Sequence, residues 1–392
     1  MRFVDTAARS CEANPSVEPP DQPPSRARRC CSCFVTNFLL WALLLALIVG
    51  LAFPGPGRAM ENVQARDWPV MSTIFVAVMF IVNGLCLNST EVRKAVRSWR
   101  TLLYSAITIL GVTPILAWAE LRIALAIGVE DSLVAGFVIF NAMPTTLSSG
   151  LSLVQQAKGN AALALLITVG TNVVGVFVSP LILSGLLSSG HSLHIDPAPL
   201  LAKLCITIIA PLLLGKGLRD CVPRVARSVA NGRMYFTLVQ QSCVVLIAWM
   251  QLSKASAQIL GTPASELWMV LLTAVSIHGT YLVFNWGGSR IMRFAESDRK
   301  AVIILCSQKT FPVAMAVISF LDPKFVPDNG LLIIPCLCSH FVQLFWDAII
   351  ATWWANRAGC ATVESLSAEL ALRQREAGHV RLARPAPPLF VD

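Results

Sequence analysis

The chain has 392 residues, of which 55% are apolar and only 14% charged, and its formal net charge is +9 at pH 7. Soluble domains carry about 25% charged residues, so this composition excludes a soluble enzyme and a soluble nucleic-acid-binding domain. The apolar residues fall in blocks of about twenty, the length that an α-helix needs to cross a bilayer. We therefore expect an all-α membrane protein whose partner is the lipid bilayer and not nucleic acid.

The first 33 residues are polar and rich in proline, which predicts a disordered tail, 1–33. Ten apolar segments follow, and each predicts a membrane-spanning helix. In chain order they are 34–53, 68–87, 101–119, 132–155, 160–187, 199–218, 235–253, 265–286, 301–321 and 330–355. A polar tail, 356–392, completes the chain.

Basic residues in the loops support this count. With the N-terminus inside, fourteen Lys and Arg residues fall in cytoplasmic loops and five in outer loops, which agrees with the positive-inside rule. The fourteen are Arg93, Lys94, Arg97, Arg100, Lys158, Lys216, Arg219, Arg224, Arg227, Arg233, Arg290, Arg293, Arg299 and Lys300. The five are Arg58, Arg66, Arg122, Lys254 and Lys324. We expect a multi-pass protein of the plasma membrane or an endomembrane with both termini in the cytoplasm.

Ten helices divide into two sets of five, 34–188 and 199–355. Because five is an odd number, the second set starts on the opposite side of the membrane, so the halves are inverted. Transporters with inverted repeats bind substrate near the bilayer midplane, where interrupted helices meet. The fourth helix of each half is interrupted, as Phe140-NAMPTTLSSG and as Leu305-CSQKTFPVA. The sequence thus predicts two inverted five-helix repeats with broken, crossing helices 4 and 9, as in a secondary transporter.

The first interruption is rich in groups that can bind a ligand. It contains Asn141, Pro144, Thr145, Thr146, Ser148 and Ser149. Ser and Thr also serve as packing and hydrogen-bonding residues in membrane helices. So many of them around one proline favour a binding site.

Lys309 in the second interruption lies about ten residues inside its helix, and therefore near the bilayer centre at 1.5 Å per residue. A buried ammonium ion is costly and indicates a functional site; a structural ion pair is the alternative. The interruption as a whole offers Gln308, Lys309 and Thr310. His340, Gln343 and Asp347 share one face of the last helix, and Asn172 reaches the same depth, so these four are candidate partners.

The sequence offers little support for an ATP-driven protein, an enzyme or a metal site. The sequence has no G-x-x-x-x-G-K-[ST] loop for ATP, and no Ser/His/Asp set outside the apolar segments. The twelve cysteines are scattered, and His278 has no second histidine at a metal-ligand spacing. We expect no enzyme activity and no cofactor, with sodium or protons as the candidate coupling ions.

The interrupted helices and the stretch 144–183, PTTLSSGLSLVQQAKGNAALALLITVGTNVVGVFVSPLIL, resemble the bile acid:sodium symporter superfamily. The similarity covers about residues 34–355. Asn83-GLCLNSTEVRKAVRSWR and Cys338-SHFVQLFWDAI are most similar to a divergent branch that contains the seventh vertebrate member and plant plastid relatives. The resemblance implies a secondary-active transporter of a small organic anion.

The resemblance also implies a set of sodium ligands, but this chain has only some of the residues in that set. Residues of this chain at the ligand positions are Ser148, Ser149, Thr168 and Gln308, of which Ser149 replaces an asparagine. A second hydroxyl, an acidic residue and a glutamine of the sodium-coupled members fall on Ala164, Ile304 and Ile109. Lys309 lies beside Gln308 and would supply the positive charge that sodium supplies elsewhere, which leaves sodium coupling in doubt.

Two alternative functions remain open at this point. The degraded sodium site also suits a membrane regulator that transports nothing and controls calcium homeostasis, as the divergent branch implies. It equally suits a sodium-independent anion carrier that resembles auxin-efflux carriers. The residues identify neither the substrate nor the oligomeric state.

Overall fold

The computed structural model describes residues 26–65, 68–89, 98–146, 148–188, 197–321 and 329–382, and its side chains are described within 38–357 apart from 188 and 329. Contacts divide the chain into two units, Met1–Phe38 and Leu39–Asp392. Five of the loop residues used above lie outside the described residues: Arg66, Arg93, Lys94, Arg97 and Lys324.

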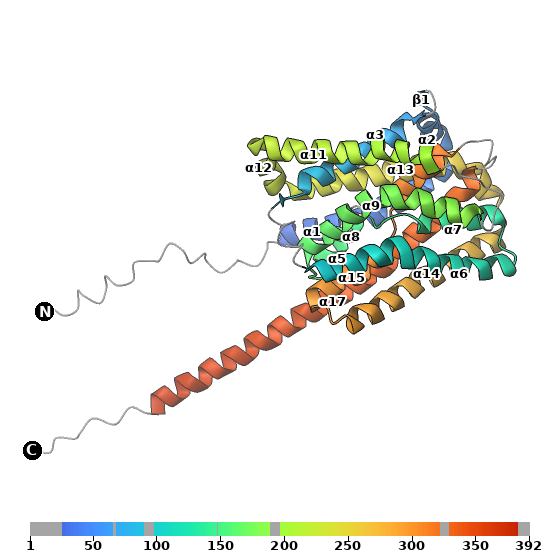
Figure 1. Cartoon of the computed structure of the whole chain (residues 1–392). Helices are drawn as coiled ribbons and strands as arrows, with labels where there is room; N and C mark the ends of the chain where they lie inside the picture. The colour runs from blue at the N-terminus through green and yellow to red at the C-terminus, as the bar shows by residue number, and fades with distance from the viewer. Residues whose placement is uncertain are drawn as a thin grey trace, which may run out of the picture. The chain divides into compact units, whose positions relative to one another are not determined.

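The described residues are mostly helical (Figure 1), which confirms the predicted class. The first half contains α1 (Arg26–Ala52), α2 (Pro54–Glu61), α3 (Val70–Cys86), α5 (Trp99–Ile107), η2 (Thr108–Val112), α6 (Thr113–Ala126), α7 (Asp131–Asn141), α8 (Ser149–Gln156) and α9 (Ala161–Ser188). The second contains α10 (Pro197–Leu204), η3 (Cys205–Ile209), α11 (Ala210–Cys221), α12 (Pro223–Asn231), α13 (Arg233–Gly261), α14 (Ala264–Ile291), α15 (Glu296–Ser307), α16 (Phe311–Phe320) and α17 (Asn329–Leu382). A short antiparallel ribbon pairs β1 (Gln64–Ala65) with β2 (Trp68–Pro69).

Within the described residues, seven helical segments are long and apolar enough to cross a membrane, and an eighth if α1 and α2, which meet at a bend of 97°, form one span. The seven are Trp99–Ala126, Ala161–Leu187, Pro197–Cys221, Arg233–Gly261, Ala264–Ile291, Glu296–Phe320 and Gly330–Arg357. Helices α3 and α7 are apolar but shorter. A multi-pass membrane protein is therefore supported, whereas the count of ten spans stays a prediction.

Two stretches differ from expectation. Helix α1 begins at Arg26, eight residues before the predicted start at 34, because the intervening Arg, Ala and Cys residues do not break a helix. The expected loop after 218 contains α12, which starts at Pro223, a residue whose fixed φ suits the first turn of a helix. Of the α12 side chains, Val229 is buried.

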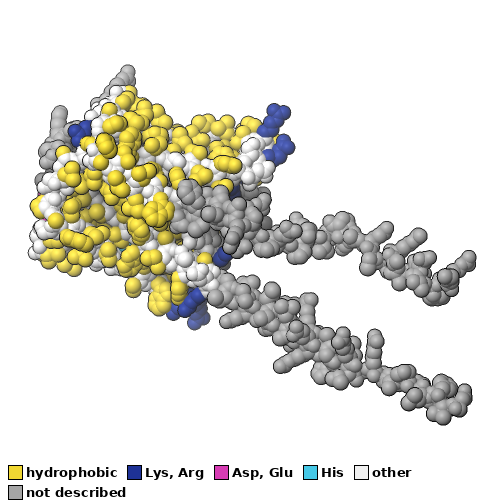
Figure 2. All heavy atoms as spheres, turned by 180° about the vertical axis from the view of Figure 1, so that it is seen from behind, with side chains coloured by type: hydrophobic (Ala, Val, Ile, Leu, Met, Phe, Trp, Pro, Cys, Tyr) yellow, Lys and Arg dark blue, Asp and Glu magenta, His cyan; other side chains and the backbone are white. Residues whose placement is uncertain are grey.

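The surface is apolar where a soluble protein would be polar. Trp41, Leu45 and Ile48 on α1 are 61–68% exposed, and yellow apolar side chains cover much of the face in Figure 2. Large contiguous apolar surfaces mark contact with a membrane or a partner. In contrast, the most apolar 18-residue stretch of Glu296–Phe320 is buried throughout. This segment, formed by α15 and α16, is the centre of the molecule.

Two glycines allow α3 and α11 to pack closely. A Cβ atom on Gly84 would lie 2.2 Å from the carbonyl oxygen of Leu212, and one on Gly215 would lie 2.1 Å from that of Ile81. Small residues permit such backbone contact between membrane helices.

We expect Gly84→Ala to lower the melting temperature of the purified protein in detergent, since the added methyl group must push two backbones apart at a cost of about 1–3 kcal/mol. Gly217→Ala on α11 is the matched control, because a Cβ there meets no heavy atom within 4 Å. Equal melting temperatures for the two variants would contradict the close packing.

Candidate functional site

Both predicted interruptions are present. Residues 142–148 separate α7 from α8, and residues 308–310 separate α15 from α16. Pro144 lacks an N–H group and disfavours helix in the residue before it. Pro312 sits in the first turn of α16, where a missing N–H costs nothing. Each interruption therefore ends one half-helix and starts another.

The two interruptions contact each other directly. The N–H of Thr310 donates to the carbonyl oxygen of Pro144 at 2.9 Å. The hydroxyl of Thr145 donates to the carbonyl oxygen of Leu305 at 2.5 Å. Backbone groups freed inside hydrocarbon need protein partners, and here each interruption supplies partners for the other. We call this meeting point the crossover.

The ammonium group of Lys309 lies at the crossover and is bound by backbone oxygens. The residue is 1% exposed, and its Nζ donates to the carbonyl oxygen of Met143 at 3.0 Å and to that of Ile109 at 2.7 Å. Ile109 belongs to the π-helix η2, in which a carbonyl pairs with the N–H five residues later. That residue is Pro114, which has no N–H, so the oxygen is available to the lysine.

The alternative interpretation of Lys309, a structural ion pair with a residue such as Asp347, is not found among the described residues. Among the described residues Lys309 forms no salt bridge, and Asp347 instead lies 3.1 Å from His278. Asp347 was a candidate partner because it shares a helix face with His340, the residue at the depth of Lys309, but the two helices turn Lys309 and Asp347 toward different neighbours. The Nζ of Lys309 is therefore held by neutral carbonyl oxygens, with no carboxylate among the described residues to compensate a positive charge there.

Gln343 on α17 supports the backbone of Lys309. Its Oε1 accepts the N–H of Lys309 at 2.9 Å, and its Nε2 donates to the carbonyl oxygen of Lys309 at 2.8 Å. The same Nε2 lies 3.0 Å from Nδ1 of His340, whose ring stacks on Phe311 with centroids 5.1 Å apart. The predicted face of the last helix thus packs against the second interruption.

Asp347 is fully buried and joins two helices to the crossover. Its Oδ2 accepts from Nε2 of Gln308 at 2.5 Å, and its Oδ1 accepts from Nε2 of His278 on α14. His278 was not among the predicted site residues, because it has no second histidine at a metal-ligand spacing. An ionisable residue in the middle of an apolar helix was the signal that could have identified it.

The first interruption is held by α9 and α14. Asn172 on α9 donates to the carbonyl oxygens of Thr145 and Thr168 at 3.0 and 2.8 Å. The Oδ1 of Asn141 accepts the hydroxyl of Tyr281, a residue absent from the predicted site, at 2.7 Å. The hydroxyls of Thr146 and Ser149 pair with each other at 2.7 Å. Ser148 precedes α8 and is buried, but no bond within the described part of the chain links its hydroxyl to the other predicted residues.

Five buried polar atoms near the crossover have no partner among the described residues: Thr168 Oγ1, Asn172 Oδ1, Gln308 Oε1, Thr310 Oγ1 and His340 Nε2. Unpaired buried polar atoms are rare in folded proteins and call for an explanation. Four of the five are uncharged oxygens, the atoms that hard cations such as sodium prefer. Of the predicted sodium ligands, Thr168 and Gln308 keep such an oxygen, while the Ser149 hydroxyl is already paired.

Comparison with known proteins agrees with this architecture. Residues 37–356 match the model of the SBF-like CPA transporter family. The probable sodium/metabolite cotransporter BASS4 (chloroplastic) of Arabidopsis thaliana is 31% identical over 329 residues, which cover 82% of this chain and 73% of that protein. Sodium/bile acid cotransporter 7 of Mus musculus is 23% identical, covering 80% and 92% of the two chains. The putative symporter YfeH of Escherichia coli K12 is also 23% identical, covering 79% and 90%.

These relatives include a plant plastid protein and the seventh vertebrate member, so the resemblance drawn from the residues is confirmed. The family match spans both interruptions and every candidate site residue. The chain belongs to the SBF-like CPA transporter family.

Proposed function

We propose that this protein is a secondary-active carrier of a small organic anion, and that the anion binds at the crossover. The observation that carries the proposal is the buried ammonium of Lys309, which lies between two interrupted helices without a carboxylate partner among the described residues. An uncompensated buried charge is expensive. An anionic substrate would compensate it.

The helix ends at the crossover also favour a negatively charged ligand. Helices α8 and α16 both begin there, and the N-terminus of a helix carries a partial positive charge. Interrupted helices of inverted-repeat transporters direct such ends at anionic substrate groups. Two helix N-termini and one ammonium therefore surround the proposed site.

Sodium is not required for this mechanism. The carbonyl oxygens of Ile109 and Met143 could have bound a cation, but the Lys309 ammonium already occupies them. The unpaired oxygens of Thr168, Asn172 and Gln308 could still take sodium. We propose that the fixed ammonium replaces one coupling ion and that transport proceeds without sodium, with protons as the coupling ion.

Counterflow in liposomes tests the proposal. Purified protein would be reconstituted, preloaded with an unlabelled organic anion, and assayed for uptake of the same labelled anion across a panel of carboxylates and sulfates. We expect saturable counterflow that is equal in sodium and in choline buffers. No counterflow for any anion would contradict transport and favour the membrane regulator, and a strict sodium requirement would contradict the role of the ammonium.

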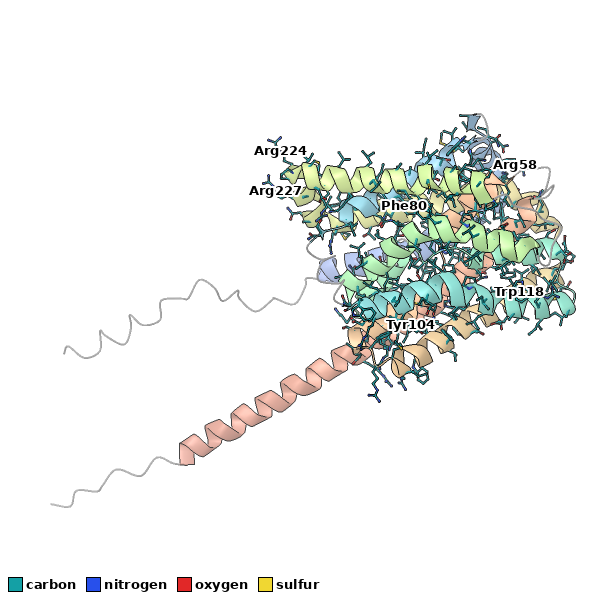
Figure 3. All side chains as sticks on the ribbon, viewed as in Figure 1. Arg58, Phe80, Tyr104, Trp118, Arg224 and Arg227 are labelled. Atoms are coloured by element: carbon teal, nitrogen blue, oxygen red, sulfur yellow. The ribbon has the colours of Figure 1, made fainter. Side chains whose placement is uncertain are left out.

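The proposed topology has ten spans in two inverted repeats with both termini in the cytoplasm. At 1.5 Å per residue the 17 residues of α3 extend about 26 Å, close to the roughly 30 Å of a hydrocarbon core. Helices α7 and α8 would cross together. Figure 3 places Arg224 and Arg227 at one end of the helices and Arg58 at the other, as the alternation of loop charges requires.

Glycosylation provides a test of this orientation. Asn88-Ser-Thr is the one N-x-[ST] sequon of the chain, and the topology places it in a cytoplasmic loop, on the side of Lys216, whose Nζ donates to Ser89 at 2.6 Å. We expect no glycan at Asn88 in a eukaryotic host. A mobility shift removed by a glycosidase and abolished by Asn88→Gln would overturn the orientation.

A further inference from the structure

A second cavity lies away from the crossover, between α14, α15 and α17. Its volume is about 870 Å³, within the range of small-molecule sites. None of its lining residues belongs to the candidate site described above. Its apolar wall includes Val283 and Ile349, which are 71% and 68% exposed. These residues lie on membrane-spanning segments, so this wall faces the hydrocarbon of the bilayer.

The other end of the cavity is strongly basic. Arg290, Arg299, Lys300 and Arg357 line it together with one carboxylate, that of Glu296, which leaves a net charge of +3. Lys300 pairs with Glu296 at 3.3 Å. Within the described residues, none of the three arginines has a carboxylate partner. In Figure 2, dark-blue basic side chains border the yellow apolar surface at the lower edge of the bundle.

Tryptophans hold two of these arginines in place. The guanidinium of Arg290 lies 4.1 Å from the ring centroid of Trp286, and that of Arg357 lies 4.0 Å from the ring centroid of Trp353. Stacking fixes the plane of a guanidinium while its N–H groups stay free to bind a phosphate in a bidentate manner. Tryptophan beside arginine at the end of a spanning helix is typical of the headgroup level of a membrane.

We propose that this cavity binds an anionic phospholipid, with its phosphate on Arg290, Arg299 and Arg357 and its acyl chains along Val283 and Ile349. The combination of a basic end and a lipid-facing apolar wall selects this ligand. A zwitterionic lipid would carry its own cation into a region of net charge +3. A soluble phosphate would leave the apolar wall unused. Basic pockets between membrane helices are known to suit anionic headgroups.

Lipid titration of the purified full-length protein tests the proposal. Delipidated protein in detergent would be titrated with phosphatidylglycerol and with phosphatidylcholine of the same acyl chains, and bound lipid would be counted by native mass spectrometry. We expect one phosphatidylglycerol to bind at least tenfold more tightly than phosphatidylcholine. Addition of inorganic phosphate should not displace it.

The double variant Arg290→Gln/Arg357→Gln should lose this preference. The matched control is Arg224→Gln/Arg227→Gln on α12, which removes the same charge from exposed positions outside the cavity. Arg299→Gln provides a milder variant if the double variant does not fold. Equal binding of the two lipids, displacement by inorganic phosphate, or an equal loss in the control would each overturn the proposal.

Discussion

Replacing Lys309 with glutamine should weaken substrate binding at least tenfold, which corresponds to about 1.4 kcal/mol. Two opposite charges 4 Å apart attract by about 4 kcal/mol at an effective dielectric constant near 20, so a tenfold loss allows for most of that attraction to be offset by desolvation. Glutamine is shorter and uncharged, and it would remove the Lys309 donor from the carbonyl oxygens of Met143 and Ile109, of which Ile109 keeps the hydroxyl of Thr113 at 3.1 Å. An unpaired buried group costs about 1–3 kcal/mol, so the melting temperature should fall as well.

The Lys309 prediction is checked by substrate affinity and melting temperature measured in parallel. Lys309→Arg should also impair binding, because a planar guanidinium does not fit a site shaped for a point charge. Lys254→Gln, a partly exposed lysine on α13, is the control and should change neither quantity. Since Lys309 does not pair with Asp347, adding Asp347→Asn should not restore stability. Unchanged affinity in Lys309→Gln would rule out a role in substrate binding.

The same variant offers an independent readout of the lysine's role. In Lys309→Gln the carbonyl oxygen of Met143 loses its donor and that of Ile109 keeps only the hydroxyl of Thr113. Together with oxygens such as Gln308 Oε1, which has no partner among the described residues, they resemble a cation site. We expect sodium, relative to choline at equal ionic strength, to raise the melting temperature of this variant more than that of the wild-type protein. A sodium effect of equal size in both proteins would contradict replacement of sodium by the ammonium.

Asp347→Ala should be among the most destabilising single substitutions in the chain. The carboxylate is 0% exposed and accepts hydrogen bonds from His278 and Gln308. Removing the carboxylate leaves two buried donors, those of His278 and Gln308, without their acceptor, at a cost of about 1–3 kcal/mol each. We therefore expect a large fall in melting temperature together with loosening of the second interruption.

A surface aspartate and a double-mutant cycle provide the controls for Asp347. Asp220 pairs with Lys216 at 2.7 Å, but its side chain is 53% exposed, and exposed pairs contribute only about 0–1 kcal/mol. Asp220→Ala should thus be nearly neutral. His278→Ala combined with Asp347→Ala should cost less than the sum of the single changes, since the two residues interact. If Asp347→Ala and Asp220→Ala have the same melting temperature, the hydrogen bonds of Asp347 to His278 and Gln308 do not stabilise the fold.

Much of the secondary structure follows from the sequence because the bilayer restricts which backbone conformations can span it. Apolar blocks of about twenty residues define helices that span the membrane, and proline in such a block marks an interruption. Both interruptions were predicted at the correct residues, around Pro144 and Lys309. The burial of polar side chains there also followed, since a charge in mid-helix must face the protein interior.

The partners of those side chains were decided only by the tertiary structure. Counting residues along a helix gives depth in the membrane but not the rotation of the helix about its axis, so His340, Gln343 and Asp347 were all left as candidate partners of Lys309. The rotation is set by packing between helices, such as the close approach of α7 to α17, where a Cβ atom on Gly136 would lie 2.4 Å from the carbonyl oxygen of Leu332. In the folded chain the Nζ of Lys309 donates to the carbonyl oxygen of Ile109, 200 residues away. That oxygen is available because Pro114, five residues later, has no N–H to donate to it.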